Sequence, residues 1–377
     1  MRKIQYGGMI FEKEEKAAVE RVLKRNWWTL AEEGKAFEKE LAEYMGVKHA
    51  IFVNSGSSAL FLIFQMLSRQ PEQALKLRNE IIVPATCFPT AISAILAAGF
   101  TPVVVDVSPF DFLIDSVIVN EAITPNTFGI LAVHTAGNVC NLNDLQILCN
   151  ENDLTLIEDN CDGLGGEYGG KRVGSFGISA VSFHAAHIIS TGQGGAVFTD
   201  SDEEAEVIKS LRDWGRMPNF DDSKDGIPPL PKDYMQRYIY TEKGFNLSPI
   251  ELQAAMGREQ LKKIDRFVEA RRFNFEYLRD RLKDRYTIAQ PQPMANPCWF
   301  TIPMLTPGRK TIFEKLQEAH IEFRNILAGN IALHPAYKGI SDKIFPVADM
   351  ITKEGFWLSV HPSLTKDDLD YMIKVLT

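Results

Sequence analysis

The sequence contains no apolar run long enough to cross a lipid bilayer, which takes about 20 residues. Its first eight residues lack the apolar stretch that a secretion signal needs, and charged residues follow within a few positions. Lysine and arginine do not gather in a block, and the formal net charge is −8. Nucleic-acid-binding proteins usually show a basic patch. The sequence therefore predicts a cytoplasmic protein that binds neither membranes nor nucleic acids.

Cysteine is scarce and shows no pattern. The 377 residues include five cysteines, an odd number, and no two of them form a C-x-x-C pair. Disulfide frameworks and zinc sites both need paired or closely spaced cysteines. We therefore expect reduced, mostly buried thiols and no metal site. The five are Cys87, Cys140, Cys149, Cys161 and Cys298.

What is present is an ordinary globular composition, 45% hydrophobic and 24% charged, in which helical and strand patterns alternate. Short, almost continuous apolar strands between helices indicate a parallel sheet covered on both faces. The predicted strands are 49–53, 81–84, 101–105, 128–133, 154–157, 180–183 and 195–199. The predicted helices of this part are 12–25, 32–44, 57–68, 90–98 and 143–150.

The last third has a different organisation. Residues 217–232 are rich in proline, aspartate and serine, which predicts a long surface loop. Helical spacing then runs from 249 to about 283 and predicts one long helix that leads into a smaller α+β domain. Within that domain we expect strands at 286–289 and 299–304 and helices at 311–320 and 366–376. The predicted domains are therefore 1–248 and 249–377.

A polar segment at 54–60 stands where a predicted strand meets a predicted helix. Free backbone N–H groups at a helix N-terminus attract anions, and Gly56 lets a phosphate approach the backbone closely. Ser57 and Ser58 add hydroxyl groups. The alternative is plain capping of the helix by Ser55 or Ser57.

Two further segments follow predicted strands. Phe88 comes just after 81–84, where ligands of open α/β sheets bind, and it could stack on a flat ring or belong to the core. Asp159 and Asp162 follow 154–157. A buried carboxylate needs a cationic partner, and a protonated ring nitrogen is one. The alternative is an exposed acidic turn.

A third strand leads into the segment 182–195, which contains Ser182, His184 and His187 and ends in Gly-Gly. Read alone, its histidines are ordinary side chains satisfied by hydrogen bonds. Read together and in this order, the four segments resemble the DegT/DnrJ/EryC1/StrS family of sugar aminotransferases. The family motif S-F-H-x-x-K-x-x-x-x-G-E-G-G has a lysine where this chain has His187. The similarity extends from residues 27–29, through 244–246 (the family's G-Y-N), to 356–358.

The resemblance implies an α/β protein of the pyridoxal 5′-phosphate (PLP)-dependent fold type I. We expect a large cofactor-binding domain with a mixed, mostly parallel sheet, a small C-terminal domain, and a homodimer with shared active sites. The family's cofactor-binding positions correspond to Gly56, Ser57, Ser58, Phe88, Asp159, Asp162, Ser182, His184, His187 and Asn246. The serines would contact the phosphate, Phe88 stack on the ring, Asp159 pair with the ring nitrogen and Asp162 lie near the ring hydroxyl. Asn246 would reach the neighbouring subunit's cofactor.

The family's lysine forms a Schiff base with PLP, which a histidine cannot do. Histidine can still move a proton near neutral pH. The histidine-bearing branch of the family consists of 3-dehydratases of nucleotide-linked 4-keto-6-deoxyhexoses, and this chain resembles that branch. Asp162 supports that branch, because the aminotransferases usually have glutamine there. Segments 134–138, 212–216 and 328–330 also resemble it.

The resemblance implies a mechanism in which His187 and Asp159 are catalytic. The cofactor works as pyridoxamine 5′-phosphate (PMP), held non-covalently, and condenses with the C4 ketone of the sugar. His187 removes a proton, the ring paired with Asp159 takes up the charge, and the C3 hydroxyl leaves. Hydrolysis releases ammonia and a 3-deoxy sugar, and glutamate, converted to 2-oxoglutarate, restores PMP.

Two alternatives remain beside this hypothesis. A reductase-coupled 3-deoxygenase of the same branch carries a [2Fe–2S] cluster, which needs about four thiolates. Only Cys298 lies beyond Cys161, so we expect no cluster. A catalytically silent PLP-fold protein that binds a sugar nucleotide is the other alternative. The chain also departs from the family at Ser248, where a basic residue is common, and at Gln193, where glutamate is usual.

Overall fold

The computed structural model describes residues 3–69, 77–216, 230–231, 234–235 and 238–377. The loop predicted at 217–232 lies outside these residues except for 230–231. A central seven-stranded sheet has the strand order β1-β9-β8-β5-β4-β2-β3. β9 pairs antiparallel with β1 and β8, and the other neighbours are parallel. The strands are β1 His49–Val53, β2 Glu80–Pro84, β3 Thr101–Val105, β4 Thr127–Val133, β5 Thr155–Asp159, β8 Ile178–Ser182 and β9 Gly195–Thr199.

Helices cover both faces of this sheet, because successive strand residues point to opposite sides. In β1, Ala50 and Phe52 join one buried apolar cluster, whereas Ile51 and Val53 join another. The first cluster contains residues of α2 Glu32–Met45, α6 Ser116–Ala122 and α7 Leu142–Asn152. The second contains residues of α3 Gly56–Leu67, α5 Pro89–Ala97 and α8 Asp202–Arg212. The predicted fold class is therefore confirmed.

The single helix predicted over 249–283 is wrong, because the chain forms two helices, α9 Glu251–Leu261 and α10 Ile264–Leu282. Between them, the Lys263 amide bonds the Gln260 carbonyl, three residues back instead of four. The Lys263 ammonium donates a hydrogen bond to Glu15 of α1 Lys13–Arg25. The spacing of apolar residues continues across this break, which is why periodicity does not reveal it.

The small domain is built on an antiparallel sheet of order β10-β12-β14-β13, formed by Thr287–Ile288, Thr301–Leu305, Gly355–Ser359 and Phe323–Arg324. Its core includes residues of α10, α11 Arg309–Glu318 and α13 Lys366–Leu376. A further sheet, β11-β6-β7, is formed by Ala295–Asn296, Glu167–Tyr168 and Lys171–Arg172, and α12 spans Pro346–Glu354.

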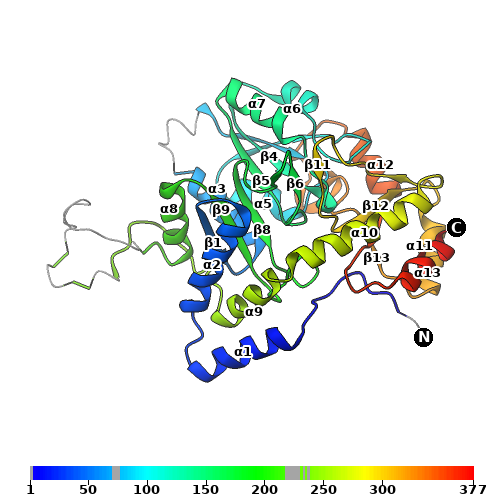
Figure 1. Ribbon diagram of the computed structural model, residues 1–377. Helices are drawn as coiled ribbons and strands as arrows, with labels where there is room; N and C mark the ends of the chain where they lie inside the picture. Colours follow the sequence, from blue (N-terminus) through cyan, green and yellow to red (C-terminus); the bar gives the residue numbers. More distant parts are fainter. Residues whose placement is uncertain (1–2, 70–76, 217–229, 232–233, 236–237) are drawn as a thin grey trace.

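Two segments cross the predicted domain boundary at residue 248. Near the N-terminus, Ile4 bridges to Ile321 and is buried in the small-domain core. Figure 1 accordingly shows both chain ends beside the small domain. Conversely, α9 packs against α1 and α2 of the large domain. Its Glu251 carboxylate accepts backbone hydrogen bonds from Ala31, Glu33 and Gly34 at the start of α2.

None of the helices in the described ranges is both long and apolar enough to span a membrane.

Candidate active site

A cavity of about 590 Å³ lies where the strands of the central sheet end. Val133, Asp159 and Ser182 end β4, β5 and β8, and each lines the cavity. Phe88 and Ser55 follow β2 and β1 and line it too. The carboxyl ends of parallel strands meet at one edge of a sheet, and ligands of α/β proteins bind there. The four predicted segments therefore come together at one place.

The N-terminus of α3 forms one wall of the cavity. Ser55 caps the helix by accepting the Ser58 amide at 3.0 Å, while Gly56 and Ser57 line the cavity. A side chain at position 56 would place its Cβ 2.6 Å from the Ser182 Cβ, so glycine fits this close approach. Ser58 is not among the lining residues, and its hydroxyl donates to the Asn54 side chain at 2.6 Å. Capping by Ser55 therefore does not close the N-terminus of α3 to the cavity.

Two buried carboxyl groups form the floor. Burial raises the pKa of Asp159, whose carboxylate accepts the Cys161 amide at 3.2 Å. Burial and the neighbouring Asp159 charge raise the pKa of Asp162 to about 7. In the described ranges neither carboxyl group forms an ion pair with lysine or arginine. Buried carboxylates without a cation are costly, so this floor fits a ligand that carries a protonated ring nitrogen.

His187 lies beside this floor. Its Nδ1 is 3.2 Å from the Ser182 carbonyl oxygen, which can only accept, so the ring proton sits on Nδ1 and Nε2 keeps its lone pair. Nε2 is 3.8 Å from the Asp162 carboxylate. Burial, with smaller effects from the charges of His184 and Arg271, lowers the pKa of His187 to about 4. At neutral pH the ring is therefore neutral and can accept a proton at Nε2.

The remaining predicted residues differ in their placement. Phe88, exposed to 54%, precedes α5 and lines the cavity, as do His184 and Gln193. Asn246 does not line this cavity and instead forms a backbone bridge with Asp213. Its expected role in a neighbouring subunit stays a prediction.

Several lining residues were missed by sequence reasoning because they come from the far ends of the chain. Tyr6 lies between Phe300 and Trp357, with ring centroids 5.8 and 6.4 Å apart. Phe300 in turn meets the His187 ring edge-on at 5.2 Å. Arg324 and Asn325 line the same side. Isolated aromatic residues read as core, and the family resemblance at 356–358 gave Trp357 no role in the site.

Arg271, in α10, is a further residue that the sequence did not reveal. Its side chain is fully buried, and it donates to the backbone carbonyls of Phe300 at 2.9 Å and His187 at 3.5 Å. It thus ties the small domain's long helix to the segment that carries His187. Its positive charge lowers the pKa of both His187 and Asp162.

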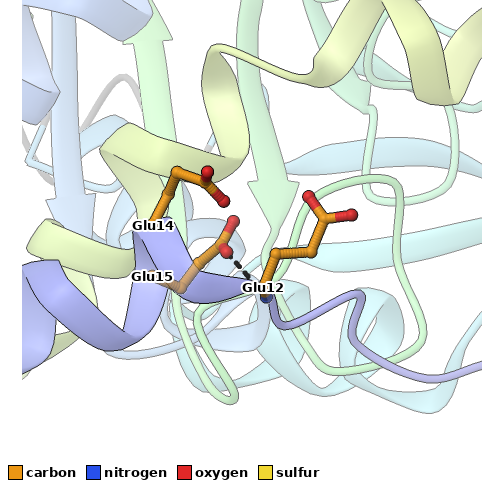
Figure 2. Close-up of side chains that lie close together, drawn as sticks. All are labelled: Glu12, Glu14 and Glu15. Carbon is orange, nitrogen blue, oxygen red and sulfur yellow. Dashed lines mark hydrogen bonds between the residues drawn. The ribbon is translucent and has the colours of Figure 1, made fainter.

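A second group of acids, Glu12, Glu14 and Glu15 at the start of α1, is close-set enough to suggest a metal site. Figure 2 shows the three side chains together, with Glu15 accepting the Glu12 amide. The Lys263 ammonium lies 2.7 Å from Glu12, 3.3 Å from Glu14 and 2.8 Å from Glu15. The Lys263 ammonium therefore already contacts all three carboxylates, and the group joins α1 to the break between α9 and α10.

Comparison with known proteins places this site in context. The chain is 36% identical to the lipopolysaccharide biosynthesis protein RfbH of Salmonella typhimurium, covering 97% of this chain and 89% of the relative. It is 34% identical to the dTDP-4-dehydro-2,6-dideoxy-D-glucose 3-dehydratase of Saccharopolyspora spinosa, covering 98% and 84%.

Two solved structures of similar proteins have the same fold as this chain. The GDP-4-keto-6-deoxy-D-mannose-3-dehydratase of Escherichia coli with bound hydrated PLP matches over 100% of both chains, with a TM-score of 0.92 and 29% identity. A GDP-4-keto-6-deoxymannose-3-dehydratase with a trapped PLP-glutamate geminal diamine matches equally fully, with a TM-score of 0.92 and 28% identity. The cofactor in both is the one that the resemblance implied. The sequence profile of one family matches residues 10–377, and the chain belongs to the DegT/DnrJ/EryC1/StrS aminotransferase family.

Proposed function

We propose that this protein is a PLP/PMP-dependent 3-dehydratase, which removes the C3 hydroxyl from a nucleotide-linked 4-keto-6-deoxyhexose and regenerates PMP with glutamate. His187 carries this proposal, because it stands at the position of the family's lysine and is a neutral base with a free Nε2. Relatives named as 3-dehydratases, and a neighbour that holds a PLP-glutamate adduct, support it.

The described residues fit the cofactor. The α3 N-terminus with Gly56 and Ser57, together with Ser182, would take the phosphate. Phe88 would stack on the ring, and Asp159 would supply the anion that keeps the ring nitrogen protonated. When bound, the cofactor supplies an electron sink for the carbon next to its amine. The structure assigns no position to Asn246 in this cavity, so its contact belongs to the proposed homodimer.

His187 has two tasks in this proposal. Its Nε2 takes a proton, and the same nitrogen then delivers a proton to the departing C3 hydroxyl. The Ser182 carbonyl fixes the tautomer that leaves Nε2 free for both steps. The Asp162 carboxyl group, with a pKa of about 7, lies 3.8 Å from this nitrogen and would be a proton donor to it.

The absence of a lysine from the described lining residues supports dehydration over transamination. An amine at position 187 would bind the cofactor covalently and compete with the sugar. The thiols give no support to the reductase-coupled alternative. An iron–sulfur cluster needs about four thiolates close together, and in the described ranges no group of three or more candidate metal ligands includes a cysteine. Burial raises the pKa of all five cysteines, which are Cys87, Cys140, Cys149, Cys161 and Cys298.

The test is incubation of the PLP-loaded protein with glutamate and a panel of 4-keto-6-deoxy nucleotide sugars, scored by ammonia release and by the mass of the sugar. We expect ammonia and a 3-deoxy product without any reductase. A requirement for a reductase would favour the alternative, and neither product from any sugar would refute the proposal.

Substitution of His187 tests its role directly. His187→Lys should lose dehydration by at least about 100-fold, the usual contribution of a general base, and should retain the cofactor through dialysis. The matched variant His187→Gln should lose dehydration equally but release the cofactor as the wild type does. Ammonia release that is unchanged in either variant would contradict the role given to His187.

A further inference from the structure

The small domain also contributes residues to the lining of the cavity. In the register of β13 and β14, Arg324 lies directly opposite Trp357. Both line the cavity, as does Asn325, which follows β13. Among the described lining residues, Arg324 is the side chain with a permanent positive charge. No part of the proposed cofactor chemistry uses these three residues.

The charge of Arg324 is only loosely compensated. Its guanidinium stands 4.9 Å above the Tyr6 ring, and Nη1 donates to the Phe323 carbonyl at 2.7 Å. Nη2 is 3.8 Å from the Glu322 carboxylate. That carboxylate is engaged more closely by Lys3 at 2.9 Å and by the Tyr6 amide at 3.1 Å. The Arg324 side chain, exposed to 54%, therefore keeps N–H groups and positive charge available to a ligand.

Trp357 adds a second unused donor. Its side chain is almost fully buried, and within the described chain its indole Nε1 has no hydrogen-bond partner. Buried N–H groups in proteins are almost always paired, so an unpaired one beside a cavity indicates that a ligand or a water completes it. The ring itself is fixed by stacking near Tyr6, which also supports Arg324.

We propose that Arg324 and Trp357, with the exposed amide of Asn325, form an anion subsite on the small-domain wall. The inference rests on the proposed function, which brings two anionic ligands to this cavity in turn. These are the carboxylates of the amino donor and the diphosphate of the sugar nucleotide. Both present anionic oxygens that a guanidinium binds through paired hydrogen bonds. The two carboxyl groups of the floor, Asp159 and Asp162, offer such anions no positive charge, whereas Arg324 does.

The experiment measures binding to the PLP-loaded protein by calorimetry, with 2-oxoglutarate in one arm and GDP, CDP and dTDP in the other. Three variants are compared with the wild type. Arg324→Met removes the charge and keeps the aliphatic stem. Trp357→Phe keeps the ring and removes the N–H group. Arg281→Met is the matched control, because Arg281 also stacks on a tyrosine of the same domain but does not line the cavity.

We expect Arg324→Met to weaken one ligand class about tenfold, and by no less than threefold, while Arg281→Met changes neither. Trp357→Phe should weaken the same class by a smaller factor. An effect on 2-oxoglutarate identifies the amino donor's carboxylate, an effect on the nucleotides identifies the diphosphate, and an effect on both shows that they share the subsite. If the wild type binds neither class, or if Arg324→Met changes both less than threefold, the subsite is refuted. Binding does not depend on turnover, so a failure of the dehydratase assay leaves this result readable.

Discussion

At the scale of single residues, burial rather than ion pairing sets the chemistry of the site. Burial lowers the pKa of His187 to about 4 and raises that of Asp162 to about 7. Both shifts favour the neutral form, as desolvation should. At neutral pH, His187 is therefore an available base, and Asp162 is partly protonated. If the two side chains were exposed, their pKa values would lie near the ordinary values of about 6.5 for histidine and 3.9 for aspartate.

The Asp162→Asn variant should be more stable than the wild type at high pH. The folded pKa of Asp162 lies above its unfolded value, so its protonated form stabilises the protein at low pH, and this contribution is lost as pH rises from about 4 through about 7. Asparagine can still accept the Ala136 amide. Urea unfolding of the cofactor-free protein at pH 8.5 should show a gain of about 1 to 3 kcal/mol, which shrinks at pH 5. A difference that does not change with pH would contradict the assignment.

At the scale of helices and strands, periodicity predicted most elements of the large domain, because their apolar faces repeat regularly. β1, for example, has the predicted bounds, 49–53. The break between α9 and α10 could not be predicted, since it depends on Lys263 meeting acids that lie about 250 residues earlier in the chain. Likewise, the Glu251 carboxylate that binds the start of α2 gives no local signal.

Lys263→Met should destabilise the protein by about 2 kcal/mol, because it leaves Glu15, which is fully buried, without its ammonium partner. Burial alone would raise the pKa of Glu15, but Lys263 and other hydrogen bonds lower it. The stabilisation is thus present above the unfolded pKa and fades as pH falls below about 4. The neighbouring Lys262→Met, which loses only an exposed pair with Glu259, should cost less than about 0.5 kcal/mol in the same urea titration. Equal losses in the two variants would argue against the role of Lys263.

At the scale of the whole molecule, the sequence predicted one half of the cavity and missed the other. Gly56, Asp159 and His187 lie in motifs at the carboxyl ends of β1, β5 and β8, strands of one sheet, so topology alone brings them together. Tyr6 and Trp357 lie near opposite ends of the chain, and only tertiary packing makes them neighbours. No spacing rule connects residues so far apart.

Ile4→Ala should weaken the attachment of the N-terminal segment to the small domain. Ile4 is buried in that core, and truncation of a buried isoleucine costs about 2 to 4 kcal/mol. The variant should therefore have a lower melting temperature than the wild type, as measured by circular dichroism. Ile344→Ala, at a position exposed to 81%, is the control and should melt as the wild type does. Identical melting of Ile4→Ala and the wild type would show that the segment contributes little.

The pairing of the first residues with the small domain also has a consequence during synthesis. The Tyr6 amide and its Glu322 partner are 316 positions apart in the chain. At a translation rate of 5–20 residues per second, the beginning of the chain waits roughly 15 to 60 s for its partner. The ribosome-bound chain therefore exposes an aromatic cavity wall that only the nearly finished protein can complete. A truncated nascent chain would lack a closed site, so premature termination should yield no partially active product.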